Sequence, residues 1–250
     1  MSSLRALILA GGRGRRLLAA SAERNKCMLE MAGKPLIEYS LDNCVRIAPR
    51  EIVIVVGYLA DQIVNHYGDS YRGIPIRYVH QAEQRGLVHA LDTAAPSLAD
   101  GEFMLFLADE VLLDPHHEAM LAEFRRSRVF ALCGLTRPRD PEAVRNTYAV
   151  LEDQQGRVLR LVEKPRRALN PWQGTGNILF DRRILDYIPL TPINPARGER
   201  ELPDLIQCAI DDGWLVKSFP VGGLYLNINR PEDLAVAETE LPALARAARA

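Results

Sequence analysis

Apolar runs and amphipathic stretches alternate along the first half of the chain. Continuous apolar runs such as "EIVIVV" indicate strands buried on both faces, and the stretches between them indicate helices. We expect strands at 4–10, 51–56, 76–80, 103–108 and 129–135, and helices at 35–43, 61–67 and 87–95. The alternation predicts an α/β fold with a doubly wound, mostly parallel sheet, in which ligands bind at the carboxyl ends of the strands.

Strands dominate the pattern in the second half. A hairpin is expected from 148–153 and 157–163, with Gly156 in the turn, because both segments flank "QQG". Further strands are expected at 176–180, 214–220 and 225–228, and helices at 182–188, 202–212 and 231–241. No linker, repeat or low-complexity stretch separates the halves. We therefore expect a single domain over residues 1–250, whose later part forms a β-rich lid over the earlier sheet.

The first predicted strand runs into a loop of glycine and arginine, "LILAGGRGRR" (7–16). Its glycines let backbone N–H groups approach a ligand closely, and its arginines add positive charge. The loop therefore predicts a phosphate site, although a solvated basic turn has the same composition. A dinucleotide fingerprint would need glycine where Leu17 stands, and no GK[ST] closes the loop as in a Walker motif. Asp109 follows another predicted strand and is expected at the same sheet edge.

Composition narrows the class of protein further. The 250 residues are 48% hydrophobic and 25% charged, with a net charge of −1, so nothing points to nucleic acid or an acidic membrane surface as a partner. The 4 cysteines are scattered without metal-ligand spacing, which is typical of reduced thiols in a cytoplasmic protein. No stretch is apolar enough for a signal peptide or a membrane span. We expect a cytoplasmic protein, with a homo-oligomer as one option.

The glycine-arginine loop and the residues after it resemble a known motif. The nucleoside-diphosphate-sugar pyrophosphorylases, or sugar-phosphate nucleotidylyltransferases, open with roughly GGxGxRLxPLTxxxPKxMLPVxGKPLI. The chain matches it, in order, at Gly11, Gly12, Gly14, Arg16, Leu17, Lys26, Met28, Leu29, Gly33, Lys34, Pro35 and Leu36. Later stretches resemble the family's further motifs in the right order: "HQAEQRGLVHAL", "FLAD", "VEKP", "GTGNILFD", "GERELPDLI" and "YLNINRPEDL".

This resemblance implies a Rossmann-like nucleotidyltransferase fold and a reaction. Residues up to about 135 would bind a nucleoside triphosphate, and residues from about 136 a phosphorylated small-molecule acceptor. With Mg²⁺, a nucleoside monophosphate would pass to a sugar 1-phosphate and pyrophosphate would leave. The implied roles are catalysis for Arg16, Lys26 and Asp109; nucleotide binding for Leu9, Ala10, Gly11, Gly12, Gly14, Gln81 and Gly86; acceptor binding for Glu163, Lys164, Thr175 and Gly176; and Mg²⁺ ligation for Asp109 and Asn227.

The chain also departs from the family pattern. Asn25 stands where proline usually precedes the lysine, which questions the stiffness of the loop, and Asn227 replaces an aspartate. Glu110 makes the metal neighbourhood more acidic, but strand alternation should point it to the face opposite Asp109. Three alternatives stay open: a cytidylyltransferase acting on a non-sugar phosphate or phosphonate such as phosphocholine, a catalytically silent regulatory homologue, and a plain NAD-binding oxidoreductase, which the missing third glycine disfavours. The base and the acceptor are not identified.

Overall fold

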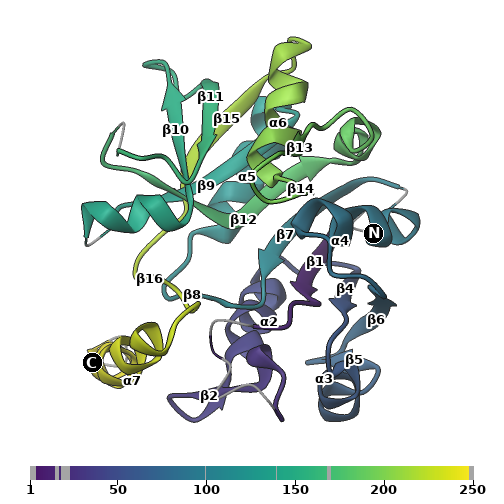
Figure 1. Ribbon diagram of the computed structural model, residues 1–250, viewed down its shortest axis with the longest axis vertical. Helices are drawn as coiled ribbons and strands as arrows, with labels where there is room; N and C mark the ends of the chain where they lie inside the picture. Colours follow the sequence, from purple (N-terminus) through teal and green to yellow (C-terminus); the bar gives the residue numbers. More distant parts are fainter. Residues whose placement is uncertain are drawn as a thin grey trace.

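An eight-stranded sheet runs through the computed structural model, which describes residues 4–14, 17, 23–98, 100–138, 140–167 and 170–247 (Figure 1). The strand order is β15-β9-β12-β7-β1-β4-β6-β5. Their bounds are β1 Arg5–Ala10, β4 Glu51–Val56, β5 Ser70–Tyr71, β6 Ile74–His80, β7 Glu102–Leu107, β9 Ala131–Thr136, β12 Gln173–Asp181 and β15 Val216–Pro220. Pairs β1–β4, β1–β7, β4–β6 and β9–β15 are parallel, which confirms the predicted doubly wound, mostly parallel sheet.

Strand β12 is the exception inside this sheet. It lies between β7 and β9 and is antiparallel to both. A strand buried on both faces has the same apolar pattern in either direction, so the sequence does not show this reversal. From the later part of the chain, β12 and β15 thus extend the central sheet itself.

Helices cover both faces of the sheet. They are α2 Leu36–Arg46, α3 Ala60–Tyr67, α4 Leu87–Ala94, α5 His117–Ser127, α6 Leu202–Asp211 and α7 Pro231–Ala247, with 3₁₀ turns η2 Lys26–Met28, η3 Ala95–Leu98, η4 Pro141–Asn146 and η5 Arg182–Tyr187. The segment expected as a helix at 182–188 is thus a 3₁₀ turn. A helix start was expected at His116 and His117, but no bounds were predicted for α5, because its buried residues His117, Met120 and Phe124 stand among charged ones.

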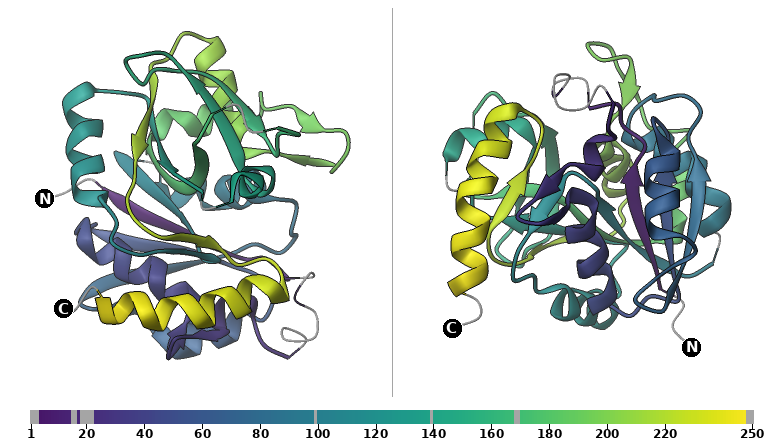
Figure 2. Two further views of the ribbon diagram at one scale, coloured as in Figure 1. Left: turned by 90° about the vertical axis from the view of Figure 1, so that its left-hand side faces the viewer. Right: turned by 90° about the horizontal axis from the view of Figure 1, so that it is seen from below.

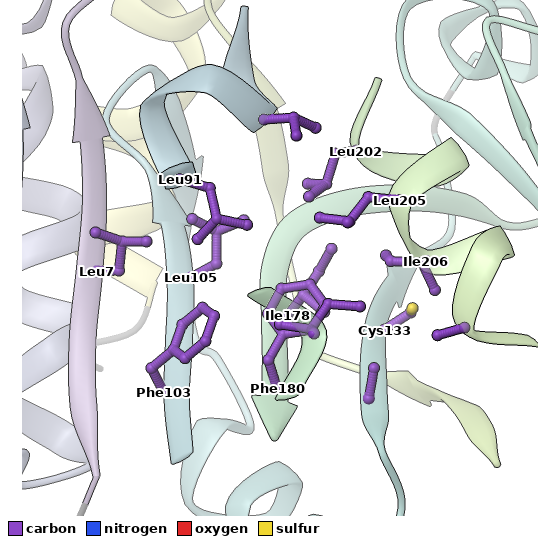
Figure 3. Packing of buried hydrophobic residues seen from close by; sticks show 14 of the residues in the cluster. Leu7, Leu91, Phe103, Leu105, Cys133, Ile178, Phe180, Leu202, Leu205 and Ile206 are labelled. Atoms are coloured by element: carbon purple, nitrogen blue, oxygen red, sulfur yellow. The ribbon is translucent and has the colours of Figure 1, made fainter. Parts of the chain in front are cut away.

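Two clusters of buried apolar side chains lie against the two faces of the sheet. Leu7 and Leu105 belong to one cluster, and their strand neighbours Ile8 and Phe106 to the other. Figure 3 shows the first cluster, with Phe103 and other strand side chains packed toward Leu91 of α4 and Leu205 of α6. Alternation along strands buried on both faces produces this two-sided core.

Smaller elements surround the sheet. The predicted hairpin forms from β10 Tyr148–Glu152 and β11 Val158–Glu163, with Gly156 in its turn. Three further pairs are antiparallel: β2 Glu30–Met31 with β3 Lys34–Pro35, β8 Glu110–Leu112 with β16 Tyr225–Asn227, and β13 Ile193–Asn194 with β14 Glu199–Arg200. Helix α7 lies against β2 and β16 (Figure 2). In the part of the chain that the structure describes, no helix has the length and apolar character to cross a bilayer.

Candidate active site

Two adjoining cavities open at the carboxyl ends of the central strands. The larger, about 630 Å³, is lined in part by residues at or just after the ends of β1, β6 and β7. The smaller, about 170 Å³, is lined chiefly by the second half of the chain. The residues that line both are Leu87, Leu107, Asp109, Glu163, Lys164, Glu201 and Asn229. This is the edge at which ligands bind in open α/β sheets.

The predicted site residues gather at these cavities. The larger is lined by Leu9, Ala10, Gly11, Gly12, Gly14, Lys26, Gln81, Gly86, Asp109, Glu163 and Lys164. The smaller is lined by Asp109, Glu163, Lys164, Thr175, Gly176 and Asn227. Arg16 lies outside the described residues. Every predicted site residue that the structure describes therefore lines one cavity or both.

The glycine loop packs directly on two other site residues. A Cβ atom at Gly11 would lie 2.6 Å from Oε1 of Gln81, so a side chain here would displace the Gln81 carboxamide. Gly14 has a φ of +59°, and a Cβ atom there would lie 2.9 Å from Cβ of Lys26. The glycines thus hold the loop against Gln81 and Lys26.

Asn25 fixes the segment that carries Lys26. Its side chain, fully buried, accepts from the Cys27 backbone N–H (2.8 Å) and donates to the Tyr58 carbonyl (2.7 Å). Its own backbone N–H donates to Oε1 of Gln62 (2.7 Å). These bonds cap the η2 turn and tie it to α3 and to Tyr58 before it, a restraint that does not need the ring of a proline.

Lys26 is buried and paired with the predicted metal ligand. Its ammonium donates to Oδ2 of Asp109 (2.6 Å) and to Oδ1 of Asn229 (3.1 Å), and the residue is 7% exposed. The Asn229 amide in turn donates to Oδ1 of Asn227. The hydrogen bonds therefore connect residues 26 and 109 of the first half with residues 227 and 229 of the second.

Asn229 was missed at the sequence level. No local pattern signals it, because β16 ends at Asn227 and strand alternation does not extend to residue 229. A hydrogen bond to α7 fixes its backbone, since the Asn229 N–H donates to Oδ2 of Asp233 in the first turn of that helix (2.8 Å).

The donor set of Asp109 and Asn227 fits a magnesium ion. Both line the smaller cavity, and their carboxylate and amide oxygens are the hard ligands that Mg²⁺ prefers. The Asp109 side chain is 28% exposed, so it is open to the cavity although Lys26 holds one oxygen. Among the described residues, no cluster of three or more His, Cys, Asp or Glu could hold a metal without help. An ion at this edge would therefore need oxygens from the phosphates of a substrate.

Glu110 corrects the expectation from strand alternation. It lines the smaller cavity together with Asp109, because residues 108–109 form a turn and the alternation of β7 does not continue into β8. The Gly176 backbone N–H donates to both of its carboxylate oxygens (2.9 Å each), and the Tyr225 hydroxyl donates to Oε1 (2.6 Å). Burial raises the pKa of Glu110 to about 8. Its oxygens thus join β8 to β12 and β16.

The side chains of Thr175 and Glu163, which both line the smaller cavity, have different kinds of partner. The Thr175 hydroxyl donates to the Gly134 carbonyl (3.0 Å) and accepts from the Asn177 backbone N–H (3.1 Å), so its side chain is committed to the sheet. The Glu163 carboxylate instead lines both cavities and lies 3.4 Å from Nζ of Lys164 and 3.3 Å from Nη1 of Arg197.

A mixed cluster of charges surrounds Glu163. Arg197, on the β13–β14 hairpin, also reaches Oε1 of Glu201 (3.0 Å). Burial, and then the nearby Glu163 carboxylate, raise the pKa of Glu201 to about 7. Arg197 and Glu201 were not predicted individually, although both belong to or adjoin the "GERELPDLI" stretch.

Comparison with known proteins decides the family. The family model described as Nucleotidyl transferase matches residues 5–234. The chain belongs to this family. As a nucleotidyltransferase it is an enzyme, and the resemblance read from its motifs is confirmed.

Two curated relatives of this nucleotidyltransferase are named for transfer to glucose 1-phosphate. The UTP–glucose-1-phosphate uridylyltransferase AglF of Haloferax volcanii is 34% identical over 239 residues, which cover 95% of this chain and 96% of AglF. A glucose-1-phosphate thymidylyltransferase of Streptomyces griseus is 31% identical over 234 residues, 92% of this chain and 64% of the relative. The two relatives use different bases, so the similarity does not identify the base for this chain.

Solved structures share the fold of this nucleotidyltransferase. A UDP-glucose pyrophosphorylase in complex with UDP-glucose aligns with a TM-score of 0.82 at 19% identity, over 96% of this chain and 98% of that one. An apo UDP-glucose pyrophosphorylase aligns with a TM-score of 0.84 at 18% identity, over the same shares. The expected Rossmann-like α/β fold is confirmed.

Proposed function

We propose that this nucleotidyltransferase transfers a nucleoside monophosphate from a nucleoside triphosphate to a sugar 1-phosphate, with Mg²⁺, and releases pyrophosphate. The observation that carries the proposal is the junction of the two cavities at Asp109. The larger cavity, with the glycine loop, suits the triphosphate, and the smaller suits the acceptor. On this proposal residues up to about 135 serve the nucleotide and the later residues mainly the acceptor.

The chemistry needs charge neutralisation rather than a general base. An oxygen of the acceptor phosphate attacks the α-phosphorus, the bond from that phosphorus to the pyrophosphate oxygen breaks, and pyrophosphate leaves. A phosphate monoester has a second pKa of about 6, so the nucleophile is already largely dianionic at neutral pH. Positioning two polyanions and stabilising the charge that develops on the leaving group are the tasks left to the protein.

The residues around the larger cavity suit those tasks. Backbone N–H groups of the loop from Gly11 to Gly14 bind triphosphate oxygens, as glycine-rich turns do. The Lys26 ammonium, held in place by Asp109 and Asn229, neutralises charge at the α-phosphate. Mg²⁺ held by Asp109 and Asn227 supplies further positive charge to the phosphates when bound.

The residues around the smaller cavity favour a polyhydroxy acceptor. The Glu163 and Glu201 carboxylates can accept hydrogen bonds from sugar hydroxyls, while Lys164, together with Arg197 from the adjoining larger cavity, balances a phosphate. Choline is typically bound in a cage of aromatic side chains. Among the described residues that line this cavity, Tyr148 is the aromatic one, and its hydroxyl donates to the Thr175 carbonyl (3.1 Å). A sugar phosphate is thus better supported than phosphocholine.

A pairwise turnover assay tests this function. UTP, dTTP, CTP, GTP and ATP are each combined with a panel of sugar 1-phosphates and with phosphocholine, and pyrophosphate release is followed through a coupled pyrophosphatase. We expect release only when a triphosphate, a sugar 1-phosphate and Mg²⁺ are all present. Pyrophosphate release with phosphocholine but with none of the sugar 1-phosphates would favour the cytidylyltransferase alternative. Nucleotide binding without turnover would indicate a silent homologue.

A further inference from the structure

The side chain of Gln81 is held by a histidine that the proposed mechanism does not use. Gln81 follows β6, is 4% exposed, and places its carboxamide beside Gly11 in the larger cavity. Nε2 of Gln81 lies 2.9 Å from Nδ1 of His89 and 3.4 Å from the Gly86 carbonyl. His89 lies in α4, whose first turn begins at the same Gly86.

Two hydrogen-bond patterns compete at His89. In the first, the Gln81 amide N–H groups donate to the Gly86 carbonyl and to Nδ1 of His89, and Nε2 of His89 carries the proton. In the second, Nη2 of Arg85 (3.1 Å) donates to Nε2 of His89, so Nδ1 carries the proton and must meet the oxygen of a rotated carboxamide. That rotation would bring the Gln81 oxygen against the Gly86 carbonyl, which only accepts.

The first pattern is favoured because the Gly86 carbonyl is fixed and the Arg85 side chain can move. The Gly86 carbonyl is held in the first turn of α4, where the Ala90 N–H donates to it (3.2 Å). The Arg85 side chain is 65% exposed and already pairs with Glu83 (3.1 Å), so it can turn away at little cost. The carboxamide nitrogen of Gln81 therefore faces His89, and the oxygen lies against Gly11 in the lining of the larger cavity.

We propose that His89 is a positioning residue that selects the base, by holding the Gln81 carboxamide with its oxygen toward the nucleotide. This inference rests on the proposed function, because it needs the base of the triphosphate to lie at Gln81. An oxygen accepts but cannot donate, so where it meets a pyrimidine at ring position 3 it requires an N–H there. Uracil and thymine carry a hydrogen at N3, whereas N3 of cytosine is a bare acceptor. The structure thus assigns uridine or thymidine triphosphate over cytidine triphosphate.

The test compares discrimination, not activity alone. His89→Phe keeps a ring but removes the nitrogen that accepts from Gln81, so the carboxamide can rotate. We expect the ratio of kcat/KM for UTP or dTTP to that for CTP to fall by about tenfold or more, the size expected when one buried hydrogen bond is left unmade. The loss should lie mainly in KM for the preferred nucleotide, with kcat little changed. His89→Gln, which can present an acceptor oxygen to Gln81, should restore part of the ratio.

Two further variants separate positioning from support of the helix. Thr93→Ala removes the hydroxyl that donates to the His89 carbonyl (2.7 Å), so it perturbs the same helix without touching Gln81, and it should keep the wild-type ratio. Arg85→Ala removes the competing donor and should keep or sharpen the ratio. A purely structural role for this cluster would lower it instead.

Binding of UTP and CTP, measured by calorimetry, distinguishes failure of the proposed function from failure of the role of His89. A nucleotide preference that depends on His89, without turnover on any acceptor, would refute the proposed function alone. An active wild-type protein that prefers CTP, or a His89→Phe variant with an unchanged ratio, would overturn the role of His89 alone. Absence of binding to any triphosphate would overturn both.

Discussion

Replacing Lys26 by methionine is the most direct test of the proposed chemistry. Methionine keeps an unbranched chain in this buried position but removes the ammonium that donates to Asp109 (2.6 Å) and Asn229 (3.1 Å). If the ammonium stabilises charge in the transition state, its loss should lower kcat by about 10²–10³-fold, or roughly 2.7–4 kcal/mol. KM for the triphosphate should change much less, because the loop amides still bind it.

The effect of Lys26→Met on folding should be smaller than its effect on turnover. The Asp109 carboxylate left behind is 28% exposed, so water can solvate it and the uncompensated charge costs little. We expect steady-state kinetics with both substrates to show the loss in kcat, while the thermal midpoint stays within a few degrees of wild type.

Lys34 provides a matched control. It belongs to the same motif and also pairs with an aspartate, Asp42 (2.5 Å), but it does not line the cavities. Lys34→Met should therefore keep near-normal kcat. Near-normal turnover in Lys26→Met, or an equal loss in Lys34→Met, would refute the reasoning.

Three further predictions follow from the described contacts. Thr175→Val removes a hydroxyl bonded to the Gly134 carbonyl and should lower the free energy of unfolding by about 1–3 kcal/mol in urea. Glu163→Gln should raise the KM for the acceptor, and Thr175→Val should raise it less. A larger KM increase in Thr175→Val than in Glu163→Gln would mean that Thr175 contacts the acceptor. Burial lowers the pKa of His117 to about 4 from 6.5, so the folded state binds fewer protons than the unfolded one between these values, and stability should fall as pH drops from 6.5 toward 4. His117→Gln should flatten that part of the profile of thermal midpoint against pH, and an unchanged slope would contradict the assignment. Asn227→Asp adds a second carboxylate and should tighten Mg²⁺ binding to the nucleotide-free protein in calorimetry, whereas tight binding by the wild type would argue against this ligand pair.

The sequence was most informative where local pattern and position in the sheet agree. The strand at 51–56 was predicted with the bounds of β4, because its apolar run is bounded on both sides by polar or turn residues. The glycine loop and Asp109 were expected at one edge, and they meet there because β1 and β7 are parallel neighbours.

The sequence was least informative where pairing between distant segments decides the outcome. The place of Glu110 depends on a turn at 108–109 and on the pairing of β8 with β16, more than a hundred residues further along. The contact of Asn229 with Lys26 depends on the same pairing. Neither the position of Glu110 nor the contact of Asn229 follows from hydrophobic periodicity. The periodicity of a strand shows which of its faces is buried, but not which strand pairs with it.

The insertion of β12 between β7 and β9 has a consequence for how the chain is made. Strand β7 cannot acquire one of its neighbours until residue 181 has been synthesised, and Lys26 cannot meet Asn229 until almost the whole chain is available. Loop closure over such separations is slow and must precede the contacts that reward it. A nascent chain that stops short of β16 would therefore hold a glycine loop and a lysine without the groups that position them. We expect nucleotidyl transfer to appear late and all at once during synthesis, rather than to be built up from a working first half.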